Sequence, residues 1–287
     1  MSSRRAAAPA EPQAPETDLE LLVRAREQEF ATTIPVGQPP VKLEARLANQ
    51  RSGSVAVVFC PALPPAGTMY IPEIAYLQAK LAQEGFVTVR FNFRGVGGSE
   101  RGGSSSFFRS AAREMEDVRD VARWLAAHRA HFKLPRLERC FVVGVSYGSV
   151  IAAAAAHFQE FDGYVAVAYP VNYLWYCTSF DSAKFFELAK SAKPKLFVWG
   201  NTDVFAGKLA MDQCFDALPE PKRKCGLDEL DSFLGHYFRS KANLDALFHA
   251  VHRFLRDESP KTTAEEQQRR GGTTTSSTAA AAAAAAA

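Results

Sequence analysis

Short apolar runs alternate along the chain with longer segments whose apolar residues recur every three or four positions. The runs are the right length for strands buried on both faces of a sheet, and they cover 54–59, 86–93, 140–145, 163–169 and 195–200. The periodic segments predict amphipathic helices over 71–85, 111–132 and 241–256. Strands that alternate with helices in this way predict a mostly parallel sheet with helices on both faces.

Two further patterns refine these elements. In 41–48 the apolar residues recur at every second position, from Val41 to Leu47, which predicts an edge strand with one face toward water. The periodic pattern of 71–85 stops at Gly85, which predicts a glycine cap at the helix C-terminus.

Both ends of the chain lack this alternation. Residues 1–20 are rich in Ala, Pro and Glu, and residues 257–287 are polar, then rich in Thr and Ser, then a run of alanine. Neither end offers an apolar face to bury, so we expect disordered tails around one folded domain over 21–256.

Composition and charge exclude several classes of protein. The net charge is +3, and no stripe of Lys and Arg with interleaved aromatic residues suggests a nucleic-acid surface. No apolar run approaches the ~20 residues that span a bilayer, and the N-terminus has no apolar core of a secretory signal, so we expect a cytoplasmic protein without a membrane span. Five scattered cysteines without a C-x-x-C spacing argue against disulfides and a zinc site, so no metal is expected; they are Cys60, Cys140, Cys177, Cys214 and Cys225.

Ser146 is the first candidate for chemistry. It stands in the G-x-S-x-G pattern GVSYG, between a predicted buried strand and an alanine-rich segment. Such a serine sits on a sharp strand-to-helix turn, and the flanking glycines relieve crowding around it. The pattern is weak alone, and its position at a strand–helix junction gives it weight. The alternative is an ordinary core serine.

A nucleophilic serine needs a base and a carboxylate that orients the base. Asp203 follows the predicted strand 195–200, and His236 precedes the last helix, so the chain order is Ser, Asp, His. The alternatives are a helix N-cap for Asp203 and a hydrogen-bonded loop histidine for His236. Fallback acids are Asp212, Asp228 and Asp231, whereas the other histidines fall on predicted helices or their ends: His128, His131, His157, His249 and His252.

Five segments together resemble a known family. FCPALPPAGTMY, VRFNFRGVGGSE, VGVSYG, GNTDVF and GHYF are similar to the landmarks of a compact branch of the α/β-hydrolase superfamily with an F-N-F-R-G-V-G-x-S loop. The resemblance spans roughly residues 40 to 256 and implies an α/β-hydrolase fold with a minimal lid. It also implies a catalytic triad of Ser146, Asp203 and His236 that hydrolyses esters, thioesters or amides without a cofactor.

The same resemblance implies an oxyanion hole. Its backbone N–H donors would come from Tyr147, after the nucleophile, and from Ala62, in the loop after an early strand. The family typically has H-P-H-P at the start of this loop, where this chain has Cys60 and Ala62 in place of the histidines. Cys60 is then either a small buried residue, which we favour, or a second nucleophile.

The loop after residue 93 has an alternative explanation that the residues do not support. A dinucleotide-binding G-x-G-x-x-G would need glycine at position 100, where this chain has Glu100, and no helix follows promptly. Arg94 and the nearby glycines are instead expected to shape the loop beside the oxyanion hole.

Aromatic residues crowd the segment that follows residue 170. Tyr173, Trp175, Tyr176 and Phe180 either line an acyl pocket near the triad or pack as ordinary core and surface aromatics.

These residues leave two hypotheses for function. The first is a serine hydrolase that forms an acyl-enzyme with a small-molecule ester, thioester or amide, and the sequence does not separate an esterase from a peptidase. The second is a hydrolase-fold binding or scaffolding protein without turnover, which would recruit protein partners through the tails.

Overall fold

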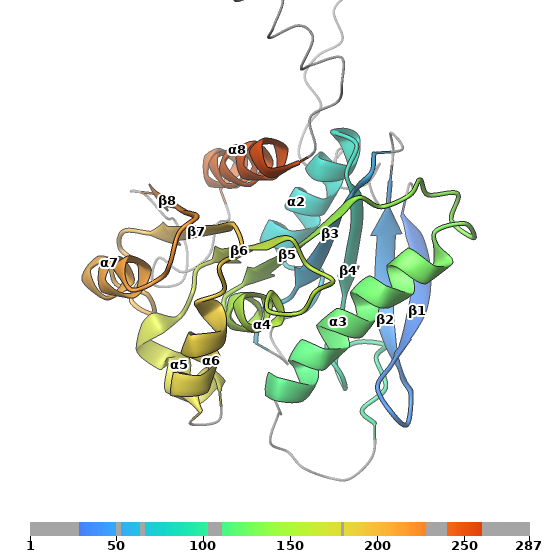
Figure 1. Ribbon diagram of the computed structural model, residues 1–287, viewed down its shortest axis with the longest axis horizontal. Coiled ribbons are helices and arrows are strands. Elements are labelled where there is room, and N and C mark those ends of the chain that lie inside the picture. Colours follow the sequence, from blue (N-terminus) through green and yellow to red (C-terminus); the bar gives the residue numbers. More distant parts are fainter. Residues whose placement is uncertain are drawn as a thin grey trace, which may run out of the picture.

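The central sheet has eight strands in the order β1-β2-β4-β3-β5-β6-β7-β8 (Figure 1). The structure is a computed structural model that describes residues 29–49, 53–63, 67–102, 111–178, 181–227 and 240–259. Pairing is parallel from β4 through β3 to β8, whereas β2 runs antiparallel to β1 and to β4. The strands are β1 (Phe30–Val36), β2 (Val41–Ala48), β3 (Val55–Cys60), β4 (Val87–Phe91), β5 (Arg139–Val145), β6 (Gly163–Val167), β7 (Lys195–Gly200) and β8 (Lys222–Leu227).

The predicted edge position of residues 41–48 is wrong. β2 pairs with β4 on one side, Ala45 opposite Phe91, and with β1 on the other, Val36 opposite Val41. The alternation that suggested an edge has another cause at Glu44, whose carboxylate accepts hydrogen bonds from Tyr70, Asn92 and Gly98. β1 occupies the edge, and its Pro35 lacks the N–H that a central strand needs.

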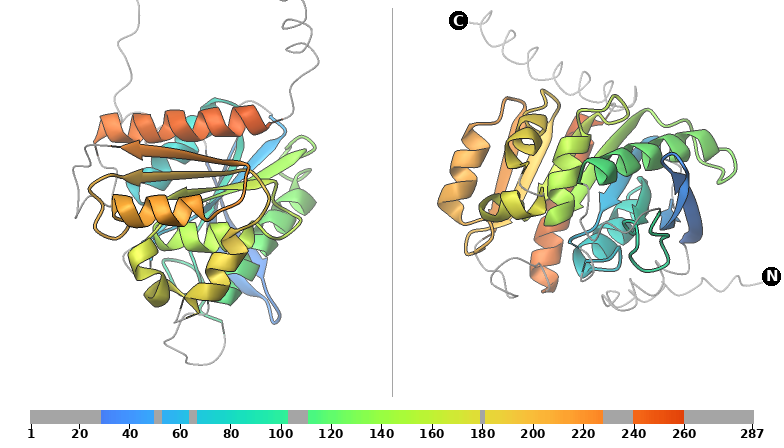
Figure 2. Two further views of the ribbon diagram at one scale, coloured as in Figure 1. Left: turned by 60° about the vertical axis from the view of Figure 1, so that its left-hand side comes forward. Right: turned by 90° about the horizontal axis from the view of Figure 1, so that it is seen from below.

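Helices cover both faces of the sheet, as predicted. α2 (Pro72–Gln83) and α8 (Lys241–Glu258) lie on one face, and the left view of Figure 2 shows α8 and α7 on opposite sides of the sheet. The other face carries α3 (Ala111–His128), α4 (Tyr147–Ala155), the 3₁₀ turn η1 (Val171–Tyr173), α5 (Leu174–Cys177), α6 (Ser182–Ala189) and α7 (Lys208–Asp216). A hydrophobic core lies on each face of the sheet, and alternate residues of β3 pack into one or the other. Ala56 and Val58 face α3 and α4, whereas Val57 and Phe59 face α2 and α8.

Gly85 ends α2 as the sequence predicts. Its φ of +100° allows the chain to leave the helix in the left-handed region, which favours glycine. The N–H of Phe86 then donates to Leu81 O, and the N–H of Gly85 donates to Ala82 O, at 3.0 and 3.1 Å. This pair of bonds is the Schellman motif, and it turns the chain directly into β4.

The carboxyl ends of the parallel strands meet at one edge of the sheet, where sites of such folds are built. Ala62 follows β3, Ser146 follows β5 and Asp203 follows β7 at this edge. Only short helices, η1, α5 and α6, connect β6 to β7 in the described part of that segment, which agrees with the predicted minimal lid. None of the helices in the described ranges is long and apolar enough to span a bilayer.

Candidate active site

Ser146 occupies the sharp turn between β5 and α4. Its backbone has φ +53° and ψ −120°, a left-handed conformation that is rare and strained for a residue with a side chain. The turn is fixed by the Ser146 N–H, which donates to Val167 O at 2.8 Å, and by the Ser146 carbonyl, which accepts from the Ser149 N–H at 2.9 Å. Ser146 is 9% exposed. A strained backbone at a buried serine, held in place by hydrogen bonds to neighbouring backbone groups, is typical of a nucleophile.

The two glycines of GVSYG are required by backbone contacts. A Cβ at Gly144 would lie 2.0 Å from Gly148 O, and one at Gly148 would lie 2.2 Å from Cys60 O and 2.3 Å from Pro61 O. The first contact is inside the turn, as the sequence predicts. The second is made with the loop after β3, so Gly148 brings the start of α4 against the segment that contains Ala62.

Ala62 lies in that loop, directly after Cys60 and Pro61, and is 1% exposed. A Cβ at Gly67 would lie 2.3 Å from the carbonyl carbon of Ala62, so Gly67 packs closely against the Ala62 backbone. The Gly67 N–H also donates to Leu63 O at 2.8 Å. The loop therefore contacts α4 through Cys60 and Pro61, and its returning end packs against the Ala62 backbone.

Tyr147 begins α4 and points its side chain into the core between α4 and α3. Its hydroxyl donates to the carboxylate of Glu114, a buried residue of α3, and its ring meets Phe93 edge-on at 5.9 Å. These contacts fix the side chain of the residue whose backbone N–H is predicted to bind the oxyanion.

Cys60 is fully buried beside this pair. Burial, and then the charge of Glu114, raise the pKa of the Cys60 thiol well above its usual value. A thiol that stays protonated is a poor nucleophile, so the structure favours the interpretation of Cys60 as a small buried residue.

Asp203 stands three residues after β7 and is 1% exposed. Its Oδ1 accepts the Phe205 N–H at 2.8 Å, which holds the carboxylate in a local turn. The alternative that Asp203 is the N-cap of the following helix is wrong, because α7 begins at Lys208 and its N-cap is Gly207. Since β6 separates β5 from β7, Asp203 and Ser146 lie at the same edge of the sheet, two strands apart.

His236 lies outside the described residues, as do Asp228 and Asp231, and their predicted roles stay predictions. The other five histidines are all described, and none follows a strand at the carboxyl edge: His128 and His131 are at the end of α3, His157 follows α4, and His249 and His252 are in α8. Asp212, the remaining fallback acid, is on α7 and pairs with Lys224 of β8 at 2.8 Å.

The aromatic segment lies next to the Asp203 turn. Tyr173 packs on Phe205 with ring centroids 5.0 Å apart, and the Asn172 N–H donates to Phe205 O at 3.1 Å. Tyr173 and Trp175 are 42% and 47% exposed, so both are accessible at the surface. Phe180 is outside the described residues, and the side chain of Tyr176 is not described.

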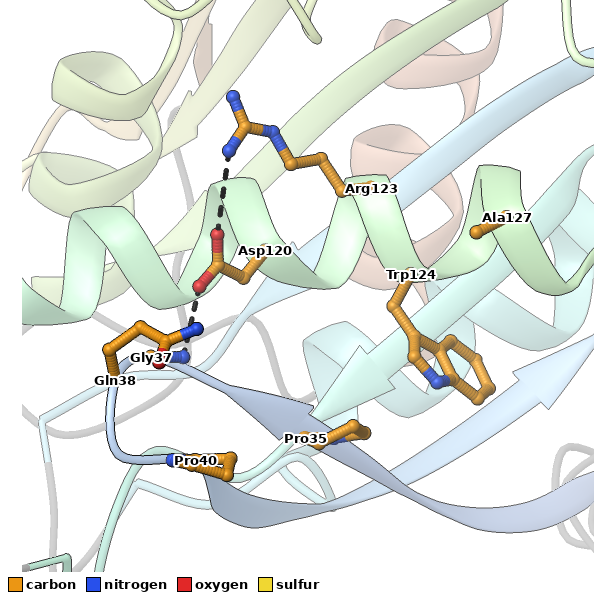
Figure 3. A pocket seen from close by; sticks show the side chains of 8 residues that line it. All are labelled: Pro35, Gly37, Gln38, Pro40, Asp120, Arg123, Trp124 and Ala127. Carbon is orange, nitrogen blue, oxygen red and sulfur yellow. Dashed lines mark hydrogen bonds and ion pairs between the residues drawn. The ribbon is translucent and has the colours of Figure 1, made fainter.

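A separate pocket lies between α3 and the turn that joins β1 to β2 (Figure 3). It has a volume of about 390 Å³. Asp120 lines it and accepts the Gly37 N–H at 3.0 Å, and Arg123 approaches the same carboxylate at 4.0 Å. None of its lining residues belongs to the candidate site, so it is not the predicted acyl pocket. Within the described ranges, no group of three or more His, Cys, Asp or Glu side chains is arranged to hold a metal ion.

Arg94 holds the loop that follows β4 against α3, and its predicted position beside the oxyanion hole stays a prediction. Its Nε and Nη2 both donate to the buried Asp117 of α3 at 2.6 Å. The bidentate pair ties the loop to α3 next to Glu114, the partner of Tyr147.

Known proteins share this architecture. A sequence model of the alpha/beta hydrolase family matches residues 57–285. A search of curated proteins gives no match. Among solved structures, a serine hydrolase without a lid from Xanthomonas campestris is 23% identical over 82% of this chain and 97% of that chain, with a TM-score of 0.63. A serine hydrolase homologue from Coxiella burnetii is 26% identical over 79% and 96%, with a TM-score of 0.61, and an esterase from Pyrococcus furiosus is 15% identical over 90% and 99%, with a TM-score of 0.63.

Proposed function

Because the chain belongs to the alpha/beta hydrolase family, we propose that it is a serine hydrolase that cleaves an ester, thioester or amide through an acyl-enzyme on Ser146. The observation that carries the proposal is the strained backbone of Ser146, φ +53°, held at the start of α4 by Gly144 and Gly148. The solved relatives described as serine hydrolases and an esterase support the same class of chemistry.

In the first half of the reaction His236 takes the proton from Ser146 Oγ while Oγ attacks the acyl carbon. The carbonyl oxygen becomes an oxyanion, which the N–H groups of Tyr147 and Ala62 stabilise. The bond to the leaving group breaks, and His236 returns the proton to that group. Asp203 orients His236 and stabilises its charged form.

In the second half, water takes the place of the leaving group. His236 accepts a proton from the water, whose oxygen attacks the acyl carbon, and then protonates Ser146 Oγ as the acid product departs. The groups of the chain and one water account for every bond and proton in this cycle.

A fluorophosphonate probe tests the nucleophile on purified full-length protein. We expect one adduct by intact mass, abolished in Ser146→Ala and slowed at least 10²-fold in Asp203→Asn and His236→Ala, since each variant removes part of a cooperating unit. Ser54→Ala, at the opposite edge of the sheet, is the control and keeps the wild-type rate. Labelling should also rise with pH across the range in which a histidine base loses its proton.

A panel of p-nitrophenyl esters, acyl thioesters and aminoacyl anilides then separates esterase, thioesterase and peptidase. Folded wild-type protein that gives neither adduct nor product would contradict the proposal. That result would favour a hydrolase-fold binding protein without turnover.

A further inference from the structure

β4 carries a polar face that is buried inside the fold. Thr88, Arg90 and Asn92 point to the α2 side of the sheet and are 0%, 1% and 0% exposed. Their neighbours Val87, Val89 and Phe91 join the apolar core on the α3 side. A buried arginine in a central strand is unfavourable unless its charge and donors are matched, so the partners of Arg90 are informative.

Arg90 joins two distant parts of the chain. Its Nη2 donates to both carboxylate oxygens of Glu29, at 2.9 and 2.8 Å, and both side chains are 2% exposed. Its Nη1 donates to Met69 O at 2.9 Å, and its guanidinium lies 5.1 Å from the centre of the Tyr70 ring. One fixed guanidinium therefore connects the residue before β1 with the residues before α2.

Asn92 and Glu44 hold the same two residues through further hydrogen bonds. Asn92 Oδ1 accepts the Met69 N–H at 2.8 Å, and Asn92 Nδ2 donates to Glu44 Oε2 at 2.7 Å. The Tyr70 hydroxyl donates to Glu44 Oε1 at 3.0 Å. Met69 is thus bound at both its N–H and its carbonyl, and Tyr70 at its ring and its hydroxyl. We call Glu29, Glu44, Arg90 and Asn92 the β4 clamp.

The β4 clamp forms hydrogen bonds with Met69 and Tyr70, at the end of the loop that contains Ala62. Gly67, two residues before Met69, packs against the Ala62 backbone, and Gly148 packs against Cys60 and Pro61 at the beginning of the loop. Ala62 therefore lies in a loop that contacts α4 at Cys60 and Pro61 and whose end is fixed by β4 at Met69. A shift of Met69 has a direct route to the Ala62 backbone through Gly67.

We propose that Arg90 is a positioning residue that sets the oxyanion hole, and that Glu29 holds Arg90 in place for this role. The inference rests on the proposed function, because it assigns Ala62 as an oxyanion donor. Transition-state stabilisation depends on donor placement, so displacing Ala62 lowers kcat while leaving KM nearly unchanged.

The double variant Glu29→Leu/Arg90→Met separates positioning from stability. Replacing both members of a buried ion pair with apolar residues is often neutral for stability, because the desolvation penalty is removed with the attraction. We expect a Tm close to wild type, a kcat for p-nitrophenyl butyrate lowered about 10- to 100-fold, and a KM within about twofold. Fluorophosphonate labelling should slow in parallel, and Arg90→Lys, which keeps the charge but loses the fork of donors, should be intermediate.

Lys195→Met is the matched control. Lys195 is also a buried cation that donates to loop carbonyls, those of Pro219 and Pro221 at 2.8 and 3.2 Å, but it does so at the beginning of β7. We expect its loss to leave kcat unchanged. Amide hydrogen exchange over residues 61–71 should speed up in the double variant and not in this control.

Each outcome decides the inference. A wild-type kcat in the double variant overturns the positioning role, whether or not exchange over 61–71 rises. A parallel loss of kcat in Lys195→Met also overturns it, since the effect would then be general. If wild-type protein shows neither turnover nor labelling, the proposed function fails and the catalytic role of the β4 clamp fails with it, even where exchange shows that the clamp holds the loop.

Discussion

The carbonyl oxygens of Cys60 and Pro61 lie where a side chain at Gly148 would begin. Carbonyls in the first residues after a strand have little freedom to retreat, so a larger residue here must move either α4 or the loop after β3. Both carry a predicted oxyanion donor. Because residue 148 has no side chain, α4 and the loop after β3 can pack this closely, and this packing sets the spacing of the predicted donors Tyr147 and Ala62.

Gly148→Ala should be both destabilising and inactivating. Overpacking of this kind typically lowers the free energy of unfolding by about 1–3 kcal/mol. Urea denaturation measures this loss, and fluorophosphonate labelling measures the displacement of the site. Gly207→Ala is a control for labelling, because its Cβ would meet its nearest neighbours at 3.8 Å, an ordinary contact, and any loss of stability there comes from alanine at the N-cap of α7. Equal losses of labelling in the two variants would contradict the role of close packing.

At the scale of elements, β7 starts with a charged residue inside the fold. Lys195 is 0% exposed, and its ammonium donates to the carbonyls of Pro219 and Pro221, in the segment before β8. Burial, partly offset by Glu220, lowers the pKa of Lys195 to about 8. The start of one strand thereby fixes the approach of the next one, at the edge opposite the candidate site.

The low pKa of Lys195 makes stability depend on pH. An unfolded lysine titrates near 10.4, so between about pH 8 and 10.4 the unfolded chain binds more protons than the native one. Native stability therefore gains from this group as pH rises through that window, by at most about 1.4 kcal/mol per pH unit, and loses the gain as pH falls to 8.

Lys195→Met lacks this titration. We expect the difference in free energy of unfolding between wild type and variant to grow in favour of wild type from pH 7.5 to pH 10. Urea denaturation at several pH values measures it, and all other titrating groups cancel in the comparison. Parallel curves for the two proteins would contradict the buried environment of this lysine.

At the scale of the whole molecule, three of the five thiols lie in the core on the α3 side of the sheet. Cys60, Cys177 and Cys214 are buried in the core on the α3 side, and all five cysteines are free. Burial raises the pKa of Cys177 and of Cys214 to about 11. At pH 8 these groups are both inaccessible and protonated.

Thiol labelling therefore reports global opening of the fold. With a disulfide reagent at pH 8, we expect at most the two half-buried thiols, Cys140 and Cys225, to react within minutes in native protein. The other three should react at the rate of unfolding, which urea accelerates, and guanidinium should expose all five. Rapid reaction of a third thiol without denaturant would contradict the packing of this core.

The sequence predicts those elements whose side chains face apolar surroundings. β3, β5 and β7 read as continuous apolar runs because both their faces are buried, and Gly85 marks a helix end through its backbone freedom. The turn at Ser146 is predictable in part for the same local reason, since Gly144 is demanded by Gly148 four residues on, whereas Gly148 is demanded by Cys60 and Pro61 in the distant loop after β3.

Other features depend on partners that no local pattern reveals. β8, KRKCGL, has no apolar periodicity, because its cations reach the neighbouring helices: Lys222 the end of α7, Lys224 its middle at Asp212, and Arg223 the end of α8. The β4 clamp joins Arg90 to a residue 61 positions away, so VTVRFNF reads as an ordinary strand. The roles of His236 and Phe180 stay predictions.

β8 also affects whether a strand of another molecule can add to the sheet. A strand at an open edge presents unpaired N–H and carbonyl groups that a strand of a second molecule can extend. Here three consecutive cations, Lys222, Arg223 and Lys224, occupy that edge, and their partners Asp212, Asp257 and Glu258 belong to helices on both sides. A second copy would have to bring its own cations against these. Addition of a strand from a second copy to this end of the described sheet is therefore opposed by charge.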